Sequence, residues 1–216
     1  LVRTSSAGKR QEGISFLLVD MNLPGITVRP IIANGGDHEF NEVFFDNVRT
    51  PKSGRVGEEN KGWEVAKFLL EFERGGNVQA GRVRSLFTRV VALIRARGAD
   101  DAGLIARMAE LGTDIDAMEM IDISVLSKLQ TGANPGPISS LVKLRWSQIR
   151  QSITELALDA IGDEALRWVE DRPLYHALQL PPDEEELLSV TPRYLNYRTY
   201  TILGGTSEIQ TNILAK

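Results

Sequence analysis

Near the C-terminus, one stretch combines residue types that could bind a cofactor. Gly204-Gly205-Thr206 leads into Ser207-Glu-Ile-Gln210, which fits a capping box at the start of a last helix. Adjacent glycines allow positive φ angles and leave no side chain in the path of a ligand. The unpaired N–H groups and the dipole of a following helix attract anions and cofactors. From these residues alone, a C-cap glycine followed by an ordinary short helix is also open.

Glu73 could act as a base. It lies four residues after Leu69 and seven before Ala80, hence on or beside the apolar stripe of a predicted helix. Positions 69, 70, 76 and 77 are Leu, Leu, Gly and Asn, so no Lys or Arg one turn away neutralises it within that helix. Apolar surroundings raise the pKa of a carboxyl group and suit it to proton abstraction. Alternatively, Glu73 is a helix-end residue paired with an arginine, which Arg74 could supply.

The elements that must position these residues are expected to be strands first and helices later. Three short strands, separated by turns that contain Asn and Gly, are predicted at residues 14–20, 26–29 and 39–46. In the third strand Phe40, Val43 and Phe45 could contribute to a core.

Helical spacing of apolar residues begins at Trp63. It predicts one long amphipathic helix from Trp63 to about Arg95, although Gly75 and Gly76 would each lower helix stability by about 1 kcal/mol. Further helices are expected at about residues 101–130, from the turn at Pro137 to Gly162, and at residues 192–202. Their expected buried residues include Ile105, Met118 and Leu129 in the second helix, and the acidic cluster of residues 183–186 is interpreted as a solvated loop or a helix start. Helices joined by short turns fit an antiparallel bundle.

Composition narrows the function classes. The chain has 216 residues, 42% of them hydrophobic, and a formal net charge of −4, which gives no general reason for nucleic-acid binding. No apolar run is long enough to span a membrane and no signal segment opens the sequence, so we expect no membrane partner. The chain contains no cysteine and two histidines, which argues against a metal site and is compatible with a cytoplasmic location. The absence of an initiator Met suggests a fragment or a processed chain.

The segment Gly204-Gly-Thr-Ser-Glu-Ile-Gln210 resembles the C-terminal signature of acyl-CoA dehydrogenases, which lies beside the flavin and the thioester in that family. Further stretches follow in the family's order: Gly13–Asp20, Pro24–Pro30, Asn41–Pro51 and Val56–Trp63. The resemblance implies an α+β fold in which a partial antiparallel β domain (residues 1–58, the C-terminal part of the middle domain) precedes an antiparallel four-helix bundle (residues 59–216). Half a β domain would leave a sheet edge and a core face uncovered.

The resemblance also implies roles for individual residues. In most members a Glu immediately before the Gly-Thr of the signature removes the α proton of the thioester, but that position is Gly204 here. A minority, including isovaleryl- and long-chain-type enzymes, carries the Glu on the helix that begins the bundle, directly before an Arg. Glu73-Arg74 with Gly204 is similar to that pattern, which implies that Glu73 is the base and lies in a cavity close to Gly204 and Gly205.

Other roles follow from the same resemblance. Gly205, Thr206 and Glu208 would lie against FAD, and Gly204 would leave space beside the thioester. Arg74 could anchor the base or the CoA moiety, or pack against a carboxylate. The implied reaction is α,β-desaturation of an acyl-CoA, with a hydride passed to FAD and electrons passed on to an electron-transferring flavoprotein.

Two departures from the family pattern concern flavin contacts made across subunits. Residues 95–101 stand where relatives have Arg-x-x-Phe-Gly, and residues 158–163 keep only Gly162 of a motif with one Gln and paired glycines. We therefore expect a homo- or hetero-oligomer, in which a partner subunit could complete some sites. The alternative is a non-catalytic structural subunit that keeps the bundle for assembly.

Overall fold

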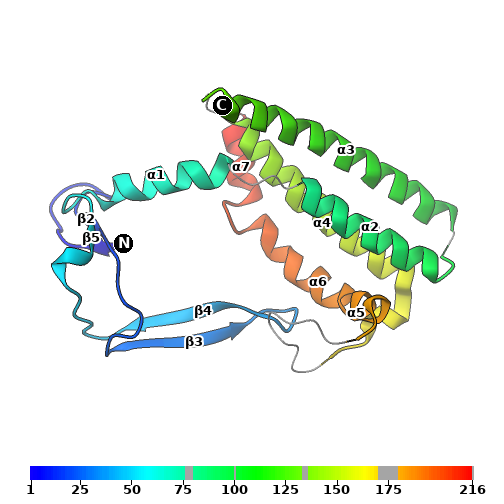
Figure 1. Cartoon of the computed structure of the whole chain (residues 1–216), viewed down its shortest axis with the longest axis horizontal. Helices are drawn as coiled ribbons and strands as arrows, with labels where there is room; N and C mark the ends of the chain where they lie inside the picture. The colour runs from blue at the N-terminus through cyan, green and yellow to red at the C-terminus, as the bar shows by residue number, and fades with distance from the viewer. Residues whose placement is uncertain (76–79, 100, 133–135, 170–179, 216) are drawn as a thin grey trace. The chain divides into compact units, whose positions relative to one another are not determined.

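The computed structural model describes residues 1–75, 80–99, 101–132, 136–169 and 180–215, except for the side chains of residues 70–75 (Figure 1). The chain divides into two units. One contains Leu1–Ile31 and Asn41–Asn77, and the other contains Ile32–Phe40 and Val78–Lys216. Each unit is described by itself below.

The first unit contains a small antiparallel sheet with strand order β1-β2-β5, formed by β1 (Val2–Arg3), β2 (Ile14–Leu17) and β5 (Arg55–Val56). A 3-10 turn, η1 (Lys52–Gly54), precedes β5, and α1 (Gly62–Gly75) follows it. Helix α1 begins directly against β2, because a Cβ on Gly62 would lie 2.4 Å from the backbone nitrogen of Phe16. Glycine at this position therefore lets the helix pack on the strand.

Strands β3 (Ile26–Ile32) and β4 (His38–Phe45) form a two-stranded hairpin. The side chains expected to contribute to a core are exposed: Phe40 is 41%, Val43 39% and Phe45 59% exposed. That expectation is wrong for this chain, because within the described residues no second layer covers the hairpin. The tip of the hairpin belongs to the second unit, in which Asn196 Nδ2 donates a hydrogen bond to Glu39 Oε1 at 3.2 Å.

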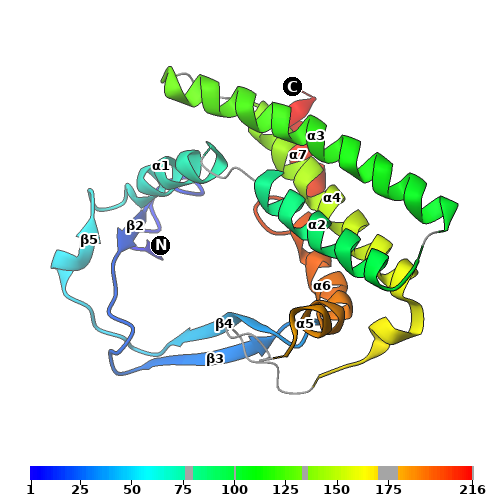
Figure 2. The same cartoon turned by 45° about the vertical axis from the view of Figure 1, so that its right-hand side comes forward.

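Helices form the second unit. In the described residues, α2 (Ala80–Ala96), α3 (Ala102–Gln130) and α4 (Ile138–Ile161) run side by side (Figures 1 and 2). The shorter elements are η2 (Gly162–Leu166), α5 (Pro182–Leu188), α6 (Val190–Tyr197), η3 (Arg198–Thr201) and α7 (Ser207–Leu214). Helix α4 is central because it contacts α2, α3, α6 and α7. These contacts enclose the core, whose most deeply buried side chains include Val83, Ile94, Ile115, Met118, Ile149, Ile153 and Leu156.

Several predicted helices are confirmed. Helix α3 has Asp101 as its N-cap, with the carboxylate accepting from the backbone nitrogens of Gly103 and Leu104, and α4 stops at Gly162, where φ is +60°. The α+β class with a helical bundle is also confirmed. The prediction of burial is wrong for Ile105 and Leu129, which lie exposed near the two ends of α3.

For the expected helix from Trp63 to Arg95, the structure describes α1 up to Gly75 and α2 from Ala80, and residues 76–79 lie outside the described residues. One other predicted helix needs correction. The expected helix at residues 192–202 is shorter, since α6 ends at Tyr197 and continues as the 3-10 turn η3.

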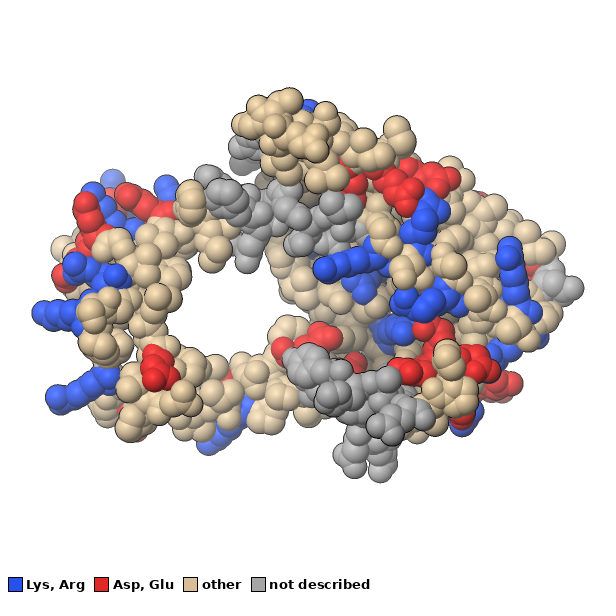
Figure 3. Space-filling model, in the orientation of Figure 1, with Lys and Arg blue, Asp and Glu red and all other residues tan. Residues whose placement is uncertain are grey.

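Both charge signs are interspersed on the surface of the bundle. Figure 3 shows Lys and Arg side chains gathered on the visible face, bordered by Asp and Glu side chains. Among the described helices, none is long and apolar enough to cross a membrane.

Candidate functional site

The glycine-rich turn before α7 has the conformation that its sequence requires. Gly204 has φ +67° and Gly205 has φ +92°, a region that residues with a Cβ rarely adopt. A Cβ on Gly205 would lie 2.6 Å from Gln210 Nε2. The buried Gln210 side chain donates from Nε2 to the carbonyl oxygen of Gly204 at 2.9 Å. The turn is therefore held from α7, while both glycines remain exposed.

Thr206, rather than Ser207, is the N-cap of α7. It has extended backbone angles (φ −62°, ψ +158°), and its Oγ1 accepts from the backbone nitrogen of Ile209 at 3.4 Å. The predicted capping box from Ser207 to Gln210 is wrong, because α7 begins at Ser207 and the Gln210 side chain reaches back to Gly204. The helix N-terminus nevertheless lies directly after the two glycines, as expected.

Glu208 lies exposed in the first turn of α7. A hydrogen bond from its own backbone N–H, a second from the Thr206 hydroxyl and the nearby charge of Lys143 lower the pKa of Glu208. A carboxyl group with a lowered pKa is a poor proton acceptor near neutral pH. Glu208 therefore suits binding or orientation better than proton abstraction.

Lys143 and Trp146, on α4, lie beneath the segment that leads into the turn. A Cβ on Gly204 would lie 3.9 Å from Lys143 Cε, and the Trp146 ring contacts the Tyr200 ring at 4.7 Å between centroids. Within the described residues, Lys143 Nζ and Trp146 Nε1 are buried and have no hydrogen-bond acceptor. Burial lowers the pKa of Lys143, and the charge of Glu208 partly opposes that shift. Neither residue is among the predicted site residues, because nothing in the local sequence sets Lys143 apart from an ordinary lysine of a helix.

Arg150 anchors the residues on the other side of this face. Its guanidinium carbon lies 5.0 Å from the ring centroid of Trp146, 4.1 Å from that of Tyr197 and 4.6 Å from that of Tyr200. A cation held against aromatic faces contributes about 0.5–2 kcal/mol per favourable contact. Burial raises the pKa of Tyr200, and Arg150 opposes that shift. This cluster fixes η3, which directly precedes the turn.

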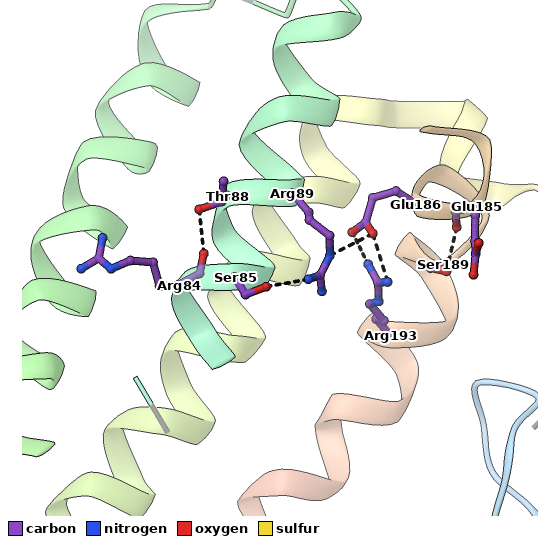
Figure 4. Close-up of polar contacts among 8 residues, drawn as sticks. All are labelled: Arg84, Ser85, Thr88, Arg89, Glu185, Glu186, Ser189 and Arg193. Atoms are coloured by element: carbon purple, nitrogen blue, oxygen red, sulfur yellow. Dashed lines mark hydrogen bonds and ion pairs between the residues drawn. The ribbon is translucent and has the colours of Figure 1, made fainter. Parts of the chain in front are cut away.

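Glu186 of α5 connects α5 and α6, the two helices before η3 and the turn, to α2 (Figure 4). The Glu186 carboxylate accepts from both terminal nitrogens of Arg193 and from Arg89 Nε at 3.2 Å. Arg89 Nη1 also donates to Ser85 Oγ at 2.8 Å. Glu186 is buried, so the acidic cluster of residues 183–186 begins α5 but is not wholly solvated.

Glu73 and Arg74 belong to α1, in the first unit. Their side chains lie outside the described residues, and the turn at Gly204 belongs to the other unit. Proximity of Glu73 to Gly204 and Gly205 therefore stays a prediction. The structure does bring together Gly204, Gly205, Thr206 and Glu208 in one turn.

Two further features bear on what the site can hold. An open pocket of about 720 Å³ in the first unit is lined by Lys9, Arg10, Trp63 and Lys67 among others, and contains none of the predicted site residues. Among the residues that the structure describes, no cluster of three His, Asp or Glu side chains could hold a metal ion.

Comparisons with known proteins assign the residues around the Gly204 turn to a known family. The model of the acyl-CoA dehydrogenase C-terminal domain matches residues 60–216. Acyl-CoA dehydrogenase IpdE1 of Mycolicibacterium smegmatis is 35% identical over 219 residues, covering 100% of this chain and 51% of the relative. The chain thus spans about half the length of this curated relative.

Solved structures share the fold. The Tcur3481-Tcur3483 steroid ACAD aligns with a TM-score of 0.78 at 24% identity, over 99% of this chain and 53% of that chain. The ChsE4-ChsE5 complex from Mycobacterium tuberculosis aligns with a TM-score of 0.75 at 22% identity, over 95% and 52%. Because the family model covers most of the residues, including the turn at Gly204, the chain belongs to the acyl-CoA dehydrogenase family.

Proposed function

We propose that the full-length protein is an FAD-dependent acyl-CoA dehydrogenase that introduces an α,β double bond into an acyl-CoA thioester, with Glu73 as the base. The observation that carries this proposal is the family match over residues 60–216, which includes both Glu73 and the turn at Gly204. The turn supports the assignment of the base: position 204 carries no side chain, and the pKa of neighbouring Glu208 is lowered.

The residues of the turn fit a flavin. Its two exposed glycines lead directly into the N-terminus of α7, a place where anionic groups bind well. The buried Nζ of Lys143, without an acceptor among the described residues, adds a lysine side chain beneath it. FAD carries a pyrophosphate, so this donor-rich and cationic surface suits it. Gly205, Thr206 and Glu208 would hold the cofactor.

The chemistry divides between the cofactor and this chain. Bound FAD supplies the capacity to accept the hydride that leaves the β carbon. Glu73 removes the α proton, so that the electron pair of the broken C–H bond forms the new double bond. Gly204 would leave room for the thioester, and Arg74 would anchor the base or the CoA moiety. The proposed electron acceptor is an electron-transferring flavoprotein.

Part of the site is proposed to come from a partner subunit. In the segment of residues 158–163, where the resemblance implies a Gln and paired glycines, this chain carries Asp159, whose Oδ2 accepts from Arg107 Nη1 at 2.6 Å on the exposed surface. The ion pair presents charged groups to a neighbouring subunit, whereas a Gln would present a neutral amide. The ChsE4-ChsE5 complex shares the fold, which supports a heteromeric arrangement. The ion pair of Asp159 with Arg107, in place of the family's flavin-contact motif, also favours the second candidate function, a structural subunit without catalysis.

The deciding experiment is the visible spectrum of the full-length protein before and after anaerobic addition of mixed acyl-CoAs. The parent should copurify with flavin and be bleached. Glu73→Gln should be bleached at least about 100-fold more slowly, because a general base contributes roughly 10²–10⁴-fold. Glu64→Gln, an exposed residue of the same helix, is the matched control and should behave as the parent. Protein without flavin would favour the structural subunit, and rapid bleaching of Glu73→Gln would require another base.

A further inference from the structure

Lys143 and Trp146 carry two buried donors that the fold leaves unused. Lys143 Nζ and Trp146 Nε1 make no hydrogen bond within the described part of the chain, although both atoms are removed from water. The residues are three positions apart on α4, so they share one face of the helix. Burying a donor, and above all a charged one, without an acceptor destabilises a folded protein. Stability alone does not account for this pair.

Both donors lie against the segment that forms the candidate site. Lys143 passes under Gly204, with 3.9 Å between its Cε and the position of a Cβ on that glycine. Trp146 packs on Tyr200, four residues before Gly204. The face of α4 that carries the two donors is therefore the floor of the turn.

Nearby groups do not satisfy the ammonium. The carbonyl oxygen of Gly204 accepts from Gln210 at 2.9 Å, and the carboxylate of Glu208 is hydrogen-bonded to the Thr206 hydroxyl. Glu208 also lies exposed, where water screens its charge. The Lys143 Nζ thus lies without an acceptor beneath a turn at the N-terminus of α7, a place where anions bind well.

We propose that Lys143 is a positioning residue of the flavin site: its ammonium, assisted by Trp146 N–H, makes the floor of the Gly204–Thr206 turn electropositive and favours binding of the anionic cofactor there. This inference rests on the proposed function. It implies that the two donors are retained for binding rather than for folding. Removing them should improve the stability of the flavin-free protein and weaken cofactor binding.

The test uses the full-length protein stripped of flavin. Lys143→Met keeps the length of the side chain and removes the charge, and Trp146→Phe keeps a ring and removes the N–H. Lys143→Arg restores the charge. Lys128→Met, at an exposed lysine in the last turn of α3, is the control for loss of one positive charge. The measurements are the midpoint of thermal unfolding without FAD, and the FAD dissociation constant from quenching of flavin fluorescence.

We expect Lys143→Met to unfold at the same temperature as the parent or higher, and to bind FAD roughly tenfold more weakly, as for a lost charge-assisted interaction. Trp146→Phe should change the unfolding temperature and the FAD affinity in the same directions as Lys143→Met, but by smaller amounts. Lys143→Arg should recover most of the affinity, and Lys128→Met should leave both unchanged. A lower unfolding temperature in Lys143→Met would indicate a structural role and overturn the proposal. Unchanged FAD affinity in that variant would also overturn it, whereas a parent that binds no FAD would refute the proposed function itself.

Discussion

Replacing Glu186 with Gln would measure how firmly the helices before the turn are held. The Glu186 side chain is 11% exposed, while those of Arg193 and Arg89 are 24% and 49% exposed. Removing one partner of a buried ion pair costs about 3–5 kcal/mol, but the half-exposed Arg89 regains water and contributes only about 0.2–1 kcal/mol. Gln also keeps one acceptor oxygen for Arg193. We therefore expect a loss of about 2 kcal/mol in the free energy of unfolding.

The assay is urea unfolding of the full-length protein, followed by tryptophan fluorescence and by hydrogen exchange of the amides of α5 and α6. Asp183→Asn, at an exposed residue in the first turn of α5, makes the same change of charge and is the matched control. It should shift the free energy by less than about 0.5 kcal/mol, as surface substitutions do. Equal stabilities of the two variants would refute the view that Glu186 joins α5 and α6 to α2.

Two further substitutions test single contacts. Asp122→Ala should destabilise the protein by about 1–2 kcal/mol, because buried Asp122 Oδ2 caps α2 by accepting from the Ala80 backbone nitrogen at 2.8 Å. Faster hydrogen exchange in the first turn of α2 would report this loss, and Glu110→Ala, at an exposed residue of α3, is its control. Gly205→Ala should cost about 1–3 kcal/mol, since φ is +92° and the new Cβ would displace Gln210. Gly81→Ala is the control, because a Cβ at this position of α2 would meet no atom within 4 Å. It should stabilise the protein by about 0.5–1 kcal/mol. Both glycine variants are measured by thermal unfolding, and a similar loss of stability in both would contradict the strain argument.

Local signals in the sequence were sufficient for helices α3 and α4. Apolar spacing placed α3 within one residue, and Gly162 ended α4 as expected, because both depend on residues adjacent in the chain. The glycine turn was also predictable, since two consecutive glycines need no distant partner to adopt positive φ angles. The cap was missed by one residue because Thr206 and Ser207 are both good N-caps, and only the backbone after Gly205 decides between them.

Contacts between distant residues were not predictable in this way. Glu186 lies in an acidic run typical of a solvated segment, and its burial depends on Arg89, 97 residues earlier. Lys143 has the spacing of an ordinary surface lysine, and its buried position depends on how α7 and the turn pack on α4. Phe40, Val43 and Phe45 have the pattern of core residues, but their exposure shows that this part of the chain does not itself supply the surface that would cover them.

The tip of the β3–β4 hairpin has a consequence for the order in which the protein folds. Gly35 packs so closely that a Cβ would lie 2.7 Å from the carbonyl oxygen of Pro192, and Glu39 accepts a hydrogen bond from Asn196, 157 residues later. At about 5–20 residues per second, the ribosome needs roughly 8 to 30 s to synthesise the 157 residues between these partners. The hairpin tip can therefore make these contacts only after α6 has been synthesised.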